Sequence, residues 1–306
     1  MISENSIGVT TVEKDRLQNR ESRFGHTKEI IDLMLNGEVK IIGPIEDFCT
    51  DIPKHDNQVD MTRIPFKHAN RILGVRVQKG DQVAQCIFKP SSGENEIVKR
   101  DTQVANFYPR ECAAWVVSEY FGFDLVPPTV IREIDGEKGS LQLFLDHSFY
   151  KNFDPLENTE ATESSRDWQT LAVFDWILAN CERHSDNMMI RIDDPTVMAA
   201  IDHGIVMSSQ NYVEMTVRGP SLQLTHSNIP DQARVIDIPV WLVKQVTDAA
   251  VKREELNQQL IQLRDFSKQQ IESFWMRVDA IIKYKKFLSK YNHKEATGIS
   301  FLGAGY

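Results

Sequence analysis

Two polar segments, Asn180-Cys181-Glu182-Arg183-His184-Ser185-Asp186-Asn187 and Ile201-Asp202-His203-Gly204, enclose a short, largely apolar part of the chain. Residues 188–192 and 197–201 are apolar runs, and the four residues between them include two aspartates and a proline. Apolar runs separated by such residues are typical of a β-hairpin. With a four-residue turn, Met188 pairs with Ile201 and Ile192 pairs with Val197.

In that register, Asn187 and Asp202 face each other at the open end of the hairpin. Cross-strand neighbours lie about 5 Å apart, which suits two oxygen ligands on one hard cation. Mg²⁺ held by so few protein ligands completes its octahedron with phosphate oxygens, so a nucleotide is the expected occupant. The alternative is that both residues merely flank a surface hairpin.

The second half of the chain is predicted to be mainly helical. Residues 168–180 are apolar almost all round, which is typical of a helix buried in the centre of a lobe. Residues 239–290 have a helical pattern of apolar positions. The core-facing candidates there are Leu256, Leu260, Leu263, Phe274, Val278 and Ile281.

The first half is predicted to be rich in strands. Residues 39–42, 72–77, 83–88, 129–134 and 140–145 have strand patterns. Residues 30–35 and 110–121 are helix candidates, each followed by a glycine stop, and residues 46–63 are a polar excursion. Strands first and helices later predict an α+β fold, with the lobe boundary near residues 144–149.

The charge balance argues against a nucleic-acid partner. The formal net charge is −9 and the isoelectric point is near 5.4, whereas proteins that bind a phosphate backbone need dense Lys and Arg. The four cysteines form no paired motif that is typical of a zinc knuckle or a disulfide scaffold.

The sequence also predicts a cytoplasmic protein. The N-terminal residues lack the basic start and apolar stretch of a signal peptide. No apolar run approaches the roughly 18 to 20 residues that span a bilayer, so no transmembrane segment is expected.

The segment Asn180–Asn187 resembles the catalytic loop of phosphatidylinositol 3/4-kinase-like enzymes, which reads Asp-Arg-His-x-x-Asn or Asp-Arg-Gly-x-x-Asn. Ile201-Asp202-His203-Gly204 is similar to their metal-binding segment. The spacing from Asp175 to Asn180 is also similar to type II phosphatidylinositol 4-kinases, Fam20 kinases and HipA-type kinases.

A group of uncharacterised bacterial phosphatidylinositol 3/4-kinase-like proteins is the most similar. The shared segments are Phe88-Lys89-Pro90, Gly93-Glu94, residues 110–114, residues 124–130 and residues 277–280. This resemblance implies a bilobal protein-kinase-like fold with a strand-rich N-lobe and a helical C-lobe. We therefore divide the chain into a polar leader (1–28), an N-lobe (29–145), a C-lobe (146–290) and a C-terminal tail (291–306).

The resemblance also implies roles for individual residues. Lys89 would contact the nucleotide phosphates, and Glu111 would hold Lys89 in place. The inter-lobe hinge would contain Gln142, Phe144 and Leu145, whose backbone binds the adenine edge. Met189 and Ile201 would cover the face of the adenine, and Asn187 and Asp202 would hold the metal.

Glu182 stands where the family has its catalytic aspartate. The longer side chain displaces the carboxylate by about 1 Å, and errors of that size can cost roughly a hundredfold in rate. Asp186 is a possible second carboxylate. Arg183 and His184 are expected to brace the loop, and Asp175 is expected to anchor it by hydrogen bonds, because a buried carboxylate needs partners.

The sequence therefore predicts a kinase that uses ATP and Mg²⁺ to phosphorylate a hydroxyl of an unidentified protein, lipid or small molecule. Two alternatives share the same fold: a nucleotide-binding pseudokinase, which the substitution at Glu182 favours, and a nucleotidyl transferase. A metal-dependent phosphohydrolase built on His184, Asp186, Asp202 and His203 is disfavoured, because the two-histidine spacing of a zinc site is absent.

Overall fold

The computed structural model describes residues 21–45, 71–96, 98–99, 104–154, 165–180, 183, 185–207 and 236–287. Several parts of the sequence interpretation lie outside these residues: the leader up to residue 20, the excursion at 46–63 and the tail at 291–306. Cys181, Glu182 and His184 of the predicted catalytic loop also lie outside them.

Five antiparallel strands form the main sheet, in the order β3-β4-β5-β7-β6. They are β3 (Glu38–Pro44), β4 (Leu73–Lys79), β5 (Gln82–Pro90), β6 (Thr129–Ile134) and β7 (Glu137–Leu143). One set of alternating side chains is buried completely or almost so: Val75, Val77, Cys86, Phe88 and Leu141. The predicted strand-rich first half is confirmed.

Two tight turns set the register of this sheet. Gly80 connects β4 to β5 with φ of 60°, and Asp135 and Gly136 connect β6 to β7 with φ of 52° and 80°. Two central residues with positive φ are the type I′ turn that Asp-Gly favours. Because this turn needs only two residues, β7 begins at Glu137, earlier than the predicted start at residue 140.

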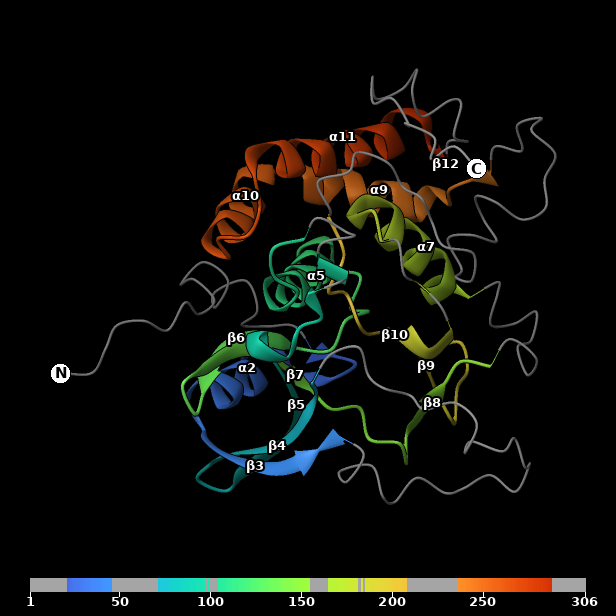
Figure 1. Cartoon of the computed structure of the whole chain (residues 1–306). Coiled ribbons are helices and arrows are strands. Elements are labelled where there is room, and N and C mark those ends of the chain that lie inside the picture. The colour runs from blue at the N-terminus through green and yellow to red at the C-terminus, as the bar shows by residue number, and fades with distance from the viewer. Residues whose placement is uncertain are drawn as a thin grey trace.

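Helix α2 (Thr27–Asn36) packs against this sheet (Figure 1). Its C-terminal end is fastened by Arg132 of β6, whose guanidinium donates to the carbonyl oxygens of Met34 and Gly37, at 2.5 Å each. These bonds satisfy carbonyl groups that a helix end leaves without intrahelical partners.

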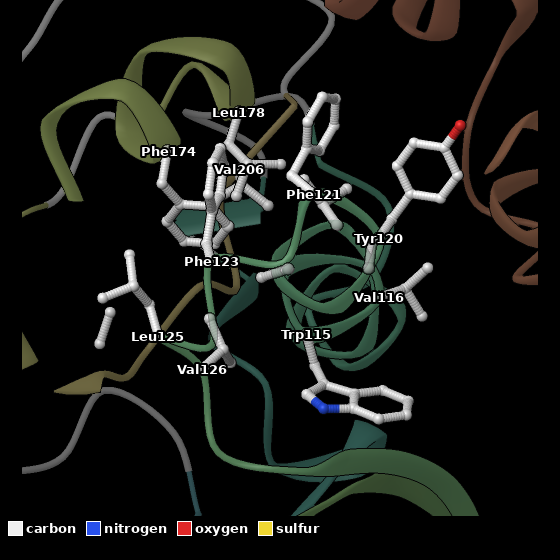
Figure 2. Close-up of a cluster of buried hydrophobic side chains, with 14 of the residues drawn as sticks. Trp115, Val116, Tyr120, Phe121, Phe123, Leu125, Val126, Phe174, Leu178 and Val206 are labelled. Carbon is white, nitrogen blue, oxygen red and sulfur yellow. The ribbon is translucent and has the colours of Figure 1, made fainter. Parts of the chain in front are cut away.

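Helix α5 (Tyr108–Phe121) lies between the sheet and the helices of the second half (Figure 1). Gly122 ends it with φ of 69°, the left-handed conformation that commonly closes a helix. Figure 2 shows Trp115 on one side of α5 and Phe121 on another. The ring of Phe123 lies edge-on to that of Phe174, with centroids 6.2 Å apart. The rings of Phe121 and Phe123 stack with centroids 5.4 Å apart. One continuous apolar core therefore reaches both halves through α5.

The second half of the chain is helix-rich. Its helices are α7 (Arg166–Leu178), α9 (Val240–Ala250), α10 (Arg253–Gln262) and α11 (Lys268–Tyr284). Its strands are β8 (Tyr150–Asn152), β9 (Met188–Arg191), β10 (Met198–Ala200), β11 (Ile236–Asp237) and β12 (Lys286–Phe287). Two further short strands, β1 (Glu21–Ser22) and β2 (Gly25–His26), precede α2. The predicted α+β fold, with a strand-rich N-lobe and a helical C-lobe, is confirmed.

Within the described residues, no helix combines the length and apolar character that crossing a bilayer requires.

The β9–β10 hairpin forms as predicted, but its register differs by one residue. Met188 pairs with Ala200, not with Ile201. The side chain of Asp194 accepts hydrogen bonds from the backbone N–H and the hydroxyl of Thr196, at 3.0 and 2.6 Å, and so widens the turn. Ile192 leaves the hairpin, because its N–H donates to the carbonyl of Phe149 instead.

This shift changes the predicted relation between Asn187 and Asp202. The residue opposite Asn187 is Ile201, whose N–H donates to the Asn187 carbonyl at 3.1 Å. Asp202 lies one residue beyond that pair and has φ of 58°, so the chain turns away from the strand direction there. The direct cross-strand pairing of Asn187 with Asp202 was wrong.

A substitution at Gly139 would test how closely β5 and β7 approach each other. A Cβ at this position would lie 2.3 Å from the carbonyl oxygen of Lys89 and 2.7 Å from Cε2 of Phe88. We expect Gly139→Ala to lower the free energy of unfolding by about 1–3 kcal/mol, the usual cost of overpacking, measured by urea denaturation. Gly80→Asn is the control, since a side chain at Gly80 meets nothing within 4 Å. Equal stability of Gly139→Ala and the parent would contradict this packing.

Candidate functional site

Three charged side chains from separate elements meet between the two lobes. Lys89 of β5 donates from Nζ to Oε1 of Glu111 at 2.5 Å and to Oδ1 of Asp202 at 2.9 Å. Glu111 lies in the first turn of α5, and Asp202 follows β10. The side chains of Lys89 and Glu111 are 17% and 3% exposed, whereas that of Asp202 is 46% exposed. The site is thus closed on the α5 side and open at Asp202.

The charges of the triad of Lys89, Glu111 and Asp202 shift one another's pKa values. Burial alone would lower the pKa of Lys89, but Asp202 and Glu111 outweigh it and raise the pKa above its ordinary value. Lys89 in turn holds the pKa of Asp202 well below its usual range. Burial raises the pKa of Glu111, and the proximity of Lys89 opposes that rise. Lys89 is therefore a charged donor, and Asp202 is an ionised carboxylate.

The backbone after β10 also binds Glu111. The N–H of His203 donates to Oε2 of Glu111 at 2.9 Å. Because Asp202 adopts a left-handed conformation, its carboxylate reaches Lys89 while the next peptide group reaches Glu111. Glu111 therefore holds both the lysine of one lobe and the segment that carries Asp202.

A second polar network is fully buried and is connected to this triad through His203. Asp175 of α7 accepts from Nδ2 of Asn180 at 2.8 Å and from Nε of Arg183 at 3.0 Å. All three side chains are at most 2% exposed. A buried carboxylate requires such partners, so the predicted anchoring of the loop by Asp175 agrees with the structure.

Arg183 also joins the two chain segments at the open end of the β9–β10 hairpin. Its Nη1 donates to the carbonyl oxygens of Asn187 and Ile201, at 2.5 and 3.0 Å. Its Nη2 contacts Nε2 of His203 at 2.7 Å. An arginine is only a donor, so Nε2 of His203 accepts and Nδ1 carries the proton. Burial and the charge of Arg183 hold the pKa of His203 well below its ordinary value, which keeps the ring neutral.

The other predicted residues of the catalytic and metal site lie on the same loop. Asn187 is buried at the end of the 3₁₀ turn Ser185–Asn187, and Asp186 of that turn is exposed. The structure therefore brings the backbones of Asn187 and Ile201 together beside Asp202. Glu182 is outside the described residues, so its predicted catalytic role stays a prediction.

Two of the predicted hinge residues, Gln142 and Phe144, have polar groups that are already paired within the sheet. The side chain of Gln142 turns into the sheet, where its Nε2 donates to Oγ1 of Thr129 at 2.9 Å. The backbone N–H of Phe144 donates to the carbonyl of Gln85 at 3.0 Å. The N–H of Phe144 is therefore already paired within the sheet and is not available to a base edge.

The remaining predicted base-contacting residues do come together. Leu145 and Met189 belong to one small apolar cluster, and Ile201 packs against it. The cluster also contains Phe24, Tyr150 and Ala199. Sequence reasoning missed Phe24, because residues 1–28 were interpreted as a polar leader. The structure places residues 21–28 in β1, β2 and the start of α2.

Comparison with protein families matches part of the chain to the family described as phosphatidylinositol 3- and 4-kinase. Residues 135–231 match it. The resemblance predicted from the sequence is confirmed. The match includes the predicted hinge residues, Arg183 and Asp202, whereas Lys89 and Glu111 precede it.

Two curated proteins are similar over part of their length. Phosphatidylinositol 4-kinase gamma 4 of Oryza sativa subsp. japonica is 30% identical over 132 residues, which is 38% of this chain and 23% of that protein. Protein Rv2133c of Mycobacterium tuberculosis (strain ATCC 25618 / H37Rv) is 24% identical over 165 residues, 44% of this chain and 58% of that protein. The chain thus spans less than two thirds of either relative.

The solved structures that are similar to this chain include the following two. One is a proinflammatory kinase of Helicobacter pylori, CtkA, with a TM-score of 0.41 and 13% identity over 75% of this chain and 92% of that chain. The other belongs to a complex of HipA, HipB and operator DNA from Shewanella oneidensis MR-1, with a TM-score of 0.39 and 10% identity over 88% of this chain and 76% of that chain.

Asp175 tests the buried network. Asp175→Ala leaves the guanidinium of Arg183 buried without its carboxylate, and breaking such a pair typically costs about 3–5 kcal/mol. We expect a loss of that size in the free energy of unfolding, and a smaller loss for Asp175→Asn, whose amide oxygen still accepts. Asp193→Ala is the matched control: Asp193 pairs with Arg191 at the surface, so little change is expected. An Asp175→Ala variant as stable as this control would contradict the anchoring role.

Proposed function

We propose that this chain is a phosphotransferase of the phosphatidylinositol 3/4-kinase-like type, which transfers the γ-phosphate of ATP to a hydroxyl with the help of Mg²⁺. The observation that carries the proposal is the bridge that Lys89 makes between Glu111 and Asp202. It joins Lys89 of one lobe, a charged side chain that is proposed to bind phosphate, to the ionised carboxylate of Asp202 in the other lobe. The match over residues 135–231 supports the same class of activity.

In this proposal Lys89 binds the phosphates of the nucleotide. Its ammonium is charged and part-buried, so its attraction for a phosphate is screened less than at an exposed site. Glu111 fixes the direction of the lysine side chain and is itself fixed by the N–H of His203. The lysine is thereby positioned before the nucleotide arrives.

Asn187 and Asp202 are the residues that would hold Mg²⁺. An amide oxygen and a carboxylate oxygen are ligands that this cation prefers, and Asp202 is both ionised and half-exposed. Arg183 ties the backbone of Asn187 to that of Ile201, which precedes Asp202. The donor set therefore fits the metal, which when bound would neutralise charge on the transferred phosphoryl group.

Leu145, Met189 and Ile201 would contact the base. They supply apolar surface from the hinge and from the β9–β10 hairpin. The acceptor hydroxyl would be oriented by Glu182, with Asp186 as a second carboxylate on the same loop. Whether the acceptor is a protein, a lipid head group or a small molecule, and whether the location is cytoplasmic, stay predictions.

Asp202 gives the cleanest test of the metal site. Because its carboxylate is half-exposed, Asp202→Ala should fold, and Lys89 retains Glu111 as its partner. We expect ATP with Mg²⁺ to raise the melting temperature of the parent, and Asp202→Ala to lose the part of this shift that depends on Mg²⁺. Asp248→Ala, on the exposed face of α9, is the control that should behave as the parent. An unchanged shift in Asp202→Ala would overturn the metal assignment.

Radiolabel transfer separates the possible reactions. Transfer from γ-labelled ATP is expected, whereas transfer from α-labelled ATP would indicate nucleotidyl transfer, and binding without any transfer would indicate a pseudokinase. We expect Glu182→Ala to retain nucleotide binding and to slow γ-label transfer by about 10²–10⁴-fold, the usual contribution of a catalytic base. Transfer by Glu182→Ala at the parent rate would remove Glu182 from the mechanism.

A further inference from the structure

The turn between β1 and β2 contacts both lobes. Ser22 of β1 pairs with Gly25 of β2, so Arg23 and Phe24 form the tip of this small hairpin. Helix α2, which packs on the main sheet, follows directly at Thr27. The tip is thus held close to the sheet on its C-terminal side.

Arg23 fastens this tip to elements on both sides of the site. Its backbone N–H donates to Asp124, in the connection after α5, at 3.0 Å. Its guanidinium donates to Asp167, in the first turn of α7, at 3.1 Å, and to the carbonyl of Met198 in β10 at 2.6 Å. Asp167 also accepts from the N–H of Met198 at 2.8 Å. Because the Arg23 side chain is only 18% exposed, these contacts are shielded from much of the solvent.

Phe24 shares one apolar cluster with residues that are proposed to contact the base. It is 9% exposed and belongs to the apolar cluster with Leu145, Tyr150, Met189 and Ala199. Two members of this cluster, Leu145 and Met189, are proposed to contact the base. The third proposed contact, Ile201, packs against the cluster and stays partly exposed.

The position of Phe24 indicates that it supports the residues of the proposed base site and does not block that site. Ala199 and Ile201 are two residues apart, so their side chains point to the same side of the strand direction. Ala199 is completely buried in the cluster, whereas Ile201 is partly exposed. Phe24, at 9% exposure, thus lies among the buried members of the cluster together with Ala199, whereas Ile201 is the partly exposed residue that packs against it. Displacing Phe24 would also break the contacts of Arg23 with Asp124 and Asp167.

We propose that Phe24 is a positioning residue for the nucleotide base, which acts through Leu145 and Met189 and is held in place by Arg23. This inference rests on the proposed nucleotide site. It assigns a role to a hairpin that precedes the main sheet, and Ser22, Arg23 and Phe24, the side chains described there, belong to neither the proposed phosphate site nor the proposed metal site. The effect of Phe24 is therefore confined to the part of the ligand that carries the base.

A comparison of two ligands tests this role. ATP and inorganic tripolyphosphate, each with Mg²⁺, share the phosphate contacts, and only ATP has a base. By isothermal titration calorimetry, we expect Phe24→Ala to weaken ATP binding by about tenfold, because Leu145 and Met189 lose a packing partner and their contact with the base is weakened. Tripolyphosphate binding should stay at the parent value. Phe24→Leu should show a smaller loss for ATP alone, and it decides the test if Phe24→Ala does not fold.

Phe149→Ala is the matched control. Phe149 lies in the same connection as Leu145, but its side chain is 65% exposed and lies outside the cluster. It should bind both ligands as the parent does. Equal losses of affinity for ATP and tripolyphosphate in the Phe24 variants would show a general structural effect. Tighter binding of ATP would show that Phe24 obstructs the base site. Either result, or unchanged ATP binding, overturns the inference alone, whereas a parent that binds neither ligand overturns the proposed function as well.

Discussion

The buried ion pair between the guanidinium of Arg183 and the carboxylate of Asp175 is the interaction on which the rest of the site depends. The guanidinium lies in the interior with its charge balanced by Asp175, and its remaining donors reach two backbone carbonyls and a neutral histidine. A buried charge is tolerated only when such partners satisfy it. The requirement therefore fixes where Asn187, Ile201 and His203 lie relative to α7. A planar group with five donors in fixed directions can impose this geometry, whereas a flexible ammonium cannot.

Glu111 extends this order into the other lobe. It accepts from Lys89 on one side and from the backbone of His203 on the other, so the sheet, α5 and the segment after β10 are connected through one carboxylate. His203 belongs to both networks, through its backbone N–H and its ring. The two lobes are thus linked by polar contacts as well as by the apolar core around α5. A shift of α5 would move Lys89 and the segment of Asp202 together.

Much of this arrangement could be predicted from the sequence, because it depends on local signals. The strand patterns of apolar residues predicted the main strands, and the family resemblance predicted that Glu111 holds Lys89 in place. The direct contact of Lys89 with Asp202 was not predicted, because Asp202 was expected to bind a metal. The hairpin register was wrong by one residue, since the hydrogen bonds of Asp194 and the alternative partner of Ile192 depend on side-chain geometry and on a distant strand. Phe24 could not be found, because nothing near it in the sequence shows that it packs against residues more than a hundred positions away.

The apolar core that passes through α5 has a consequence for how the protein comes apart. Its buried residues include members of the sheet, such as Phe88, and of the helical half, such as Phe174, in one continuous cluster. Separating the halves would expose the aromatic side chains of α5 on both sides, at a free-energy cost that grows with the apolar area uncovered. The described halves should therefore melt in a single cooperative transition, and neither half expressed alone should retain a native-like tertiary structure.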